Sequence, residues 1–290
     1  LFFMQLFVEQ LLNGIATGSI YALVTLGLAL VYGIMRILHV AHAAVYTIGA
    51  YVGLLFFNLT GSLLLATIGS MAACALVGVA IERFVYFPLL KYPPFVPLIA
   101  SITILLSVEE LCRLIAGPQI LTFPAELPFP EFQVSGVAVT STITAVYCIT
   151  AAVLGLLWVV TTKTELGLAM RAASQDMAVA DAMGINSHLI VSITFVIGSA
   201  VAAVAGILVG IYFNQVYPTM GAIPAYKTLA LIVVGGLGSV PGAVVAALLL
   251  GMAETLLIGY ADIPLPRDAL AFIAMIGMLM WRSQGLLGSR

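Results

Sequence analysis

Long apolar runs separated by short polar turns make up almost the whole of this sequence. Nine runs lie near residues 9–34, 43–58, 62–81, 95–116, 141–161, 189–212, 225–237, 240–258 and 267–281. A helix needs about 20 mostly apolar residues to cross roughly 30 Å of hydrocarbon. Only 8% of the 290 residues are charged, against about 25% in soluble domains. We therefore predict an all-α polytopic membrane protein: one transmembrane domain over residues 1–290, built as a bundle of about eight or nine transmembrane helices.

The ten lysines and arginines decide the expected orientation, because cytoplasmic loops carry an excess of these residues. If all nine runs cross and the N-terminus lies outside, seven of the ten fall inside. These seven are Arg36, Arg83, Lys91, Lys163, Arg171, Arg282 and Arg290. Arg113, Lys227 and Arg267 fall outside. With eight crossings, two of the seven would move outside and the counts would be equal, so we expect nine crossings, with the N-terminus outside and the C-terminus in the cytoplasm.

The apolar stretch 229–251, LALIVVGGLGSVPGAVVAALLLG, is interrupted by glycines and a proline between residues 235 and 242. In lipid, non-helical backbone survives only against protein or a water-filled cavity, so this break should face the interior of the bundle. Pro241 suits the first turn of a new helix, with Ser239 or Val240 as its cap. A second interruption spans residues 33–44. Paired interruptions are typical of translocation paths, but both could equally be turns in which glycines allow close packing.

Two loops are longer than a simple turn. Loop 117–140 is rich in proline and is expected outside, as a stiff connector or as a docking surface for an external partner. Loop 162–188 is the most polar part of the chain and predicts two short helices. Thr164 and Asp176 suit their N-caps, and Gly184 suits a left-handed end. The loop is either an amphipathic hairpin on the lipid surface or a helical projection that contacts a cytoplasmic protein, and its few basic residues favour the second.

Few polar residues lie within the apolar runs. Glu109, Glu110 and Arg113 lie in the outer part of their run, where Glu109 and Arg113 are spaced i, i+4, and these charges are expected to be paired or near water. Glu254 is nearly alone in its run and is therefore a candidate functional residue. His39 and His42 are spaced i, i+3, but no third ligand follows nearby, so no metal site is expected. The dispersed acids, histidines and serines form no enzyme active site. The chain also lacks the Lys/Arg cluster that nucleic-acid binding requires.

Two glycine pairs have the G-x-x-x-G spacing that lets membrane helices approach closely. These pairs are Gly14 with Gly18, and Gly206 with Gly210. The close contact could lie within the chain or against a second subunit.

Three segments together resemble the permease subunits of branched-chain amino acid ABC importers. They are NGIATGSIYALVTLGLALVYGIMRILHVAHAAVYTIGAYV (13–52), GLAMRAASQDMAVADAMGIN (167–186) and VVGGLGSVPGAVVAALLLGMAE (233–254). The resemblance covers nearly the whole chain. It implies a bacterial inner-membrane importer with two permeases, two cytoplasmic ATP-binding subunits and a periplasmic substrate-binding protein. This chain would be one permease that binds no cofactor, with ATP hydrolysed by partner subunits, and it contains no G-x-x-x-x-G-K-[ST] phosphate loop.

The resemblance also implies that residues of loop 162–188 couple the permease to the ATPase. These are Gly167, Arg171, Ala172, Asp176, Ala180, Gly184 and Ile185. The interruptions and the isolated acid supply candidates for the translocation path. These are His39, His42, Gly235, Gly236, Gly238, Ser239, Pro241, Gly242 and Glu254. The chain departs from the family where Asn-Phe-Ala-His-Gly-Glu is usual, because residues 39–44 read His-Val-Ala-His-Ala-Ala, and the missing acid weakens any inference about substrate.

The expected function is therefore the permease step of an ATP-driven importer for a small solute. Branched-chain or other amino acids are the family's usual substrates, and close relatives carry amides or urea. The alternative is a stand-alone secondary transporter or channel. That class would need a protonatable group in mid-membrane, for which Glu254 is the candidate, and would have no use for the helices of loop 162–188.

Overall fold

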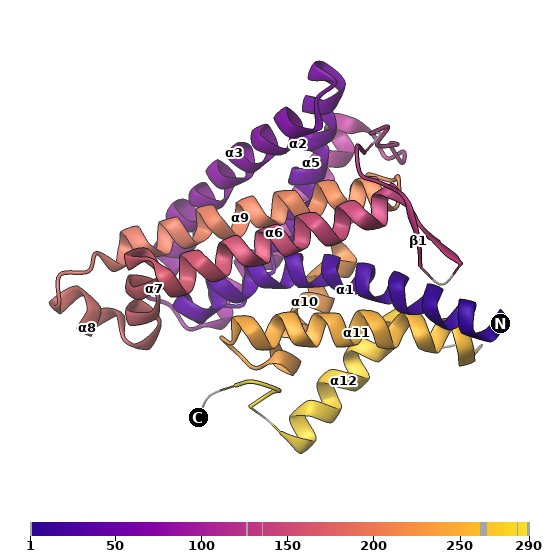
Figure 1. Ribbon diagram of the computed structural model, residues 1–290. Coiled ribbons are helices and arrows are strands. Elements are labelled where there is room, and N and C mark those ends of the chain that lie inside the picture. Colours follow the sequence, from indigo (N-terminus) through magenta and orange to yellow (C-terminus); the bar gives the residue numbers. More distant parts are fainter. Residues whose placement is uncertain (1, 126, 135, 262–265, 283, 289–290) are drawn as a thin grey trace.

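The computed structural model describes residues 2–125, 127–134, 136–261, 266–282 and 284–288 (Figure 1). Most of the described residues are helical. The elements in chain order are α1 (Phe2–Met35), α2 (His42–Thr60), α3 (Leu63–Ile81), a π-helical turn η1 (Glu82–Tyr86), α4 (Phe87–Leu89), α5 (Phe95–Ala116), β1 (Phe132–Val134), β2 (Val137–Val139), α6 (Ser141–Lys163), α7 (Glu165–Gln175), α8 (Met177–Ala182), α9 (Ser187–Tyr212), α10 (Ala222–Gly235), α11 (Val240–Ala261) and α12 (Arg267–Trp281). The strands form one antiparallel hairpin.

Helices occupy all nine apolar runs, but they differ in length. Within the described ranges, seven are long and apolar enough to cross a membrane: α1, α2, the continuous segment Leu63–Leu89, α5, α6, α9 and α11. Helices α10 and α12 have 14 and 15 residues, so each extends only about 21–23 Å at 1.5 Å per residue. The predicted helical membrane bundle is therefore confirmed, whereas the predicted number of crossings is not.

Helices α1 and α9 form the centre of the bundle. In their most apolar windows 83% and 72% of residues are buried, compared with 22% in α5 and 28% in the α3 segment. Helix α1 packs along α11 and also contacts α6, α9 and α10. The predicted glycine motifs make these close contacts inside the chain. A Cβ on Gly18 would lie 2.8 Å from Leu248 Cα of α11, and Gly206 of α9 abuts the Tyr46 carbonyl of α2.

The first predicted interruption is confirmed: α1 ends at Met35, and α2 begins at His42. The second is confirmed between α10 and α11, where Gly236 and Gly238 have φ values of +109° and +85°. Such values favour glycine, because a Cβ would clash with the backbone. Ser239 Oγ accepts from the Gly242 amide at 3.2 Å, so Ser239 is the cap of α11, and Pro241 lies in its first turn as predicted.

The C-terminal segment 284–288 donates hydrogen bonds to the carbonyls at the end of α10, which have no partner within that helix. The amides of Leu286 and Leu287 donate to the carbonyls of Val234 and Gly235, at 2.8 and 3.0 Å. The last carbonyls of a helix have no partner within it, and leaving them buried and unpaired costs free energy. Segment 284–288 therefore stabilises the open end of α10, a contact that the sequence did not predict.

The two long loops lie at opposite ends of the bundle. In Figure 1 the hairpin of β1 and β2 lies near the beginning of α1, while α7 and α8 project from the other end. Near the hairpin end, Arg113 pairs with Glu110 at 2.7 Å, three residues away, and not with Glu109 at the i, i+4 spacing. Both partners of the observed pair are exposed, whereas the Glu109 side chain is buried.

Candidate functional site

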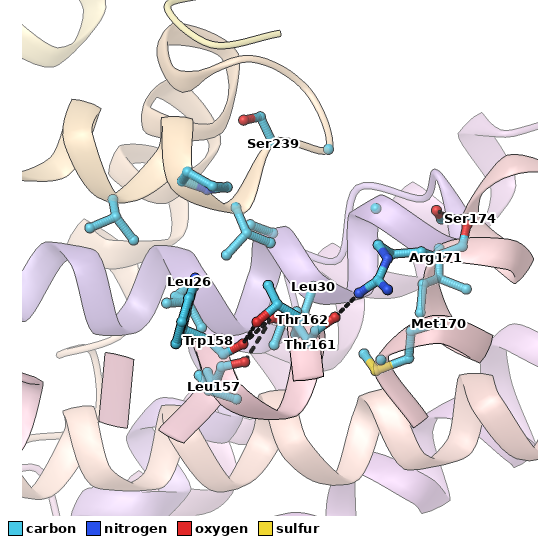
Figure 2. A pocket seen from close by; sticks show the side chains of 18 of the residues that line it. Leu26, Leu30, Leu157, Trp158, Thr161, Thr162, Met170, Arg171, Ser174 and Ser239 are labelled. Carbon is cyan, nitrogen blue, oxygen red and sulfur yellow. Dashed lines mark hydrogen bonds between the residues drawn. The ribbon is translucent and has the colours of Figure 1, made fainter. Parts of the chain in front are cut away.

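A cavity of about 590 Å3 joins the predicted coupling loop to the predicted break. Its walls come from α1, α6, α7 and the beginning of α11 (Figure 2). It brings together Gly167 and Arg171 of α7 with Gly238, Ser239 and Pro241. These two groups are about 70 residues apart in the sequence, and only the packing of α1 between them makes them neighbours. The cavity is therefore a junction between the α7–α8 hairpin and the α10–α11 interruption.

The predicted caps of the α7–α8 hairpin are confirmed. Thr164 Oγ1 accepts from the Gly167 amide at 3.1 Å, and Asp176 Oδ1 accepts from the Val179 amide at 3.0 Å. After α8, the Gly184 amide donates to the Asp181 carbonyl, and the Ile185 amide donates to the Ala180 carbonyl. This pair of bonds, with Gly184 at φ +88°, is a Schellman end.

Most of the predicted coupling residues hold the hairpin in shape. A Cβ on Gly167 would collide with the carbonyls of Val160 and Thr161, so α7 lies directly against the end of α6. Ala180 is buried, and Gly184 and Ile185 form the Schellman end described above. Their types are thus explained by the local fold, and no contact with another subunit is needed to account for them.

The Arg171 side chain turns back toward its own bundle. Its guanidinium donates to the Thr161 carbonyl in the last turn of α6, as the dashed line in Figure 2 shows. A cation at this position interacts favourably with the partial negative charge of a helix C-terminus. At the following corner, the Ser187 amide donates to Asp181 Oδ1 at 2.9 Å and holds the pKa of the Asp181 carboxyl below its usual value. Arg171 and Asp181 therefore stabilise the two ends of the hairpin.

The outward face of the hairpin carries three large apolar side chains that sequence reasoning did not single out. Leu168, Val179 and Met183 are 61%, 59% and 79% exposed. They lie on an otherwise polar loop at one end of the bundle, beyond the apolar runs. Exposed apolar side chains that cluster on a projecting element mark an interaction surface. Their signal in the sequence was that they alternate with, or closely follow, the buried Gly167, Met170 and Ala180.

The two histidines lie in a different place, at the beginning of α2. Both are buried, and their ring centroids are 5.7 Å apart. His39 Nδ1 is hydrogen-bonded to the Tyr86 hydroxyl at 2.6 Å, while Phe195 packs against the ring. Tyr86 ends the π-helical turn η1, a local widening that is often found at functional sites. Within the described ranges no three His, Cys, Asp or Glu residues are grouped as metal ligands.

Glu254 is not isolated, contrary to the sequence interpretation. Lys227 Nζ lies 2.9 and 3.0 Å from its two carboxylate oxygens, and both side chains are 2% exposed. The same ammonium contacts the Tyr21 hydroxyl at 2.7 Å and Asp268 Oδ1 at 3.2 Å. The cluster thus joins α1, α10, α11 and α12. Lys227 had been counted among the external charges, because a single sequence does not show which helices face one another.

The predicted site residues therefore occupy three separate places. The first is the junction of the coupling loop with the break, the second is the buried histidine pair, and the third is the cluster around Glu254. Within the break itself, Gly235 and Gly242 pack against each other and Gly236 packs against Gly288. These three glycines face α10, α11 and the C-terminal segment, while Gly238 and Pro241 line the cavity.

Comparison with known proteins gives a consistent result over the full length. The family model described as "Branched-chain amino acid transport system / permease component" matches residues 10–280. The chain is 34% identical to the high-affinity branched-chain amino acid transport system permease protein BraD of Pseudomonas aeruginosa, over 97% of this chain and 96% of that protein. It is 30% identical to the corresponding permease protein LivH of Escherichia coli, with the same coverage. A solved structure, PsaBC from Streptococcus pneumoniae in complex with Fab, aligns with a TM-score of 0.46 at 14% identity over 96% of this chain and 89% of that one, which is too distant to define the fold.

Proposed function

The chain belongs to the family of permease components of branched-chain amino acid transport systems, and from this premise we propose that it is the permease subunit of an ATP-driven ABC importer. The solute would be a branched-chain or other amino acid. The chain would act as a single permease domain over residues 1–290 in a bacterial inner membrane, and not as an enzyme. Its partners would be a second permease, two cytoplasmic ATP-binding subunits that hydrolyse the ATP, and a periplasmic substrate-binding protein.

The observation that carries the coupling role is the build of the α7–α8 hairpin. Both of its helices are capped at their beginnings, and it leaves Leu168, Val179 and Met183 exposed. We propose that these three side chains enter a groove of the ATP-binding subunit, while Gly167 and Arg171 anchor the hairpin to α6. The hairpin and the beginning of α11 line the same cavity. Movement of α7 would therefore change the packing at the α10–α11 interruption.

We propose nine crossings with the N-terminus outside and the C-terminus in the cytoplasm. Because Lys227 is buried in an ion pair, it no longer counts as a loop charge. The positive charges in loops then divide seven inside and two outside, from the ten in the sequence. The hairpin of β1 and β2 and the α7–α8 hairpin lie at opposite ends of the bundle (Figure 1), which suits an external and a cytoplasmic loop. Labelling Ile120→Cys and Met183→Cys variants with an impermeant maleimide from each side tests this orientation.

The translocation path is proposed to run beside the two interruptions. His39, His42 and Glu254 are buried and packed in this conformation, so solute would reach them only after the helices move. The glycines at 235–242 allow such movement, because they are the points where α10 and α11 separate. The competing secondary-transport function needs Glu254 free to exchange protons, and its ion pair with Lys227 argues against that use.

Co-purification tests the importer function. The tagged chain is isolated from membranes that also contain the ATP-binding subunits, either unchanged or with Val179→Asp and Met183→Asp together. We expect the ATPase to accompany the unchanged chain, and both the ATPase and leucine uptake to be lost from the variant. Ile120→Asp is the matched control, because it places an acid at a residue that is 58% exposed in the other long loop. Isolation of the unchanged chain without any ATPase would overturn the proposal.

A further inference from the structure

The cavity beside α7 has the form of a slot between two spans. Helix α1 packs against both α6 and α11, and the cavity is the space left between these two helices. Each wall is one face of a helix, with residues at spacings of three and four. The wall of α1 contains Leu26, Ala29, Leu30, Gly33 and Ile34, and that of α6 contains Leu154, Leu157, Trp158, Thr161 and Thr162. The slot thus follows the helices for about two turns, and α7 closes one end.

The slot opens on the outer surface of the bundle. Trp158 of α6 and Val245 of α11 line it, and they are 58% and 40% exposed. Both belong to helices long and apolar enough to span the membrane, so the mouth of the slot lies on membrane-length apolar helices. Fifteen of the twenty lining residues are apolar or glycine, so the walls offer few partners for the two charges of an amino acid. A volume of about 590 Å3 falls within the usual range for ligand cavities, roughly 300–1,000 Å3.

Basic groups gather at the end that α7 closes. Arg171 lines the slot, and Lys163 Nζ lies 5.4 Å from the centre of the Trp158 ring. None of the lining residues is acidic, and across the described ranges neither Arg171 nor Lys163 forms a salt bridge. A guanidinium has five N–H donors, so Arg171 retains donors after its bond to the Thr161 carbonyl. Trp and Lys at the end of a span are also typical of the depth at which headgroups lie.

We propose that the slot binds one acyl chain of an anionic membrane phospholipid, with the headgroup phosphate at Arg171 and Lys163. The apolar walls match the chain, and two cations that form no salt bridge within the described ranges match the phosphate. A lipid bound in this way touches α6, α7 and the beginning of α11 at once. The bound lipid would therefore connect the α7–α8 hairpin to the α10–α11 interruption by contacting both.

Native mass spectrometry of the full chain, purified from nanodiscs of mixed phosphatidylglycerol and phosphatidylcholine, tests the site. We expect phosphatidylglycerol to be retained in preference to phosphatidylcholine. Arg171→Gln should lower its retention roughly tenfold, the usual effect of one charge-assisted contact, and Lys91→Gln should not. Val245→Trp should block the slot without changing the charge. Leu257→Trp is its matched control, because Leu257 lies on the same helix, is also 40% exposed and does not line the slot.

A photoreactive phosphatidylglycerol with the reactive group in the acyl chain tests the unchanged protein, so the result does not depend on whether a variant folds. Labelling on α6 and α11 residues of the slot supports the proposal. Equal retention of both lipids overturns it, as does full retention in Val245→Trp. Labelling confined to other surfaces also overturns it. Crosslinks from Val245 to a second permease in the assembled importer would instead show that a protein partner covers the slot.

Discussion

Replacing Lys227 with methionine should destabilise the protein more than any surface change. The substitution keeps the length of the side chain but removes an ammonium that lies 2.9 and 3.0 Å from the Glu254 oxygens and 3.2 Å from Asp268. A carboxylate that is 2% exposed is then left in an apolar bundle without its counter-ion. Removing one partner of a buried ion pair typically costs about 3–5 kcal/mol. The Tyr21 hydroxyl still donates to Glu254 at 2.9 Å, so we expect the lower value, about 3 kcal/mol.

The free energy of unfolding, measured by titrating a denaturing detergent into micelles of the purified chain, tests this value. Lys91→Met is the control, because Lys91 is exposed and forms no salt bridge within the described ranges. Adding Glu254→Met to Lys227→Met should restore most of the loss, since apolar residues of similar volume often replace a buried pair without net cost. The reasoning is refuted if Lys227→Met unfolds no more easily than Lys91→Met. A double variant whose loss equals the sum of both single losses also refutes it.

Three further substitutions test the packing. Gly18→Ala should cost about 1–3 kcal/mol by forcing α1 away from α11, while Gly155→Ala, which meets no neighbour within 4 Å, should be neutral in the same unfolding titration. Tyr86→Phe should cost about 1–3 kcal/mol by leaving the buried Nδ1 of His39 without a partner, and an unchanged midpoint would contradict the bond. Gly285 has a φ of +77°, which disfavours alanine, so Gly285→Ala should loosen segment 284–288 and speed hydrogen exchange in the segment after α10. Exchange as slow as in the unchanged chain would contradict the contact of segment 284–288 with the end of α10.

The sequence by itself determined the membrane class, the positions of the helices and the local geometry of the ends. Long apolar runs must be helical in lipid, because the backbone has no other partners there. Caps were equally predictable: Thr164, Asp176 and Ser239 each accept from the amide three residues ahead. Gly184 and the break at 235–242 followed from the conformations that only glycine adopts easily. In each case the cause and its effect lie within a few residues of each other.

Only the tertiary structure decided which distant residues meet. The sequence left Glu254 alone and counted Lys227 among the external charges, although the two form a buried pair across α10 and α11. The i, i+4 spacing favoured Glu109 as the partner of Arg113. The ion pair instead forms with Glu110, three residues away, and both of its side chains are exposed. Nor does any local pattern show that the Arg171 side chain bonds to the end of α6. Apolar helices of similar composition can pack side by side in many different orders. The order adopted decides which charged side chains meet, and no local pattern in the sequence specifies that order.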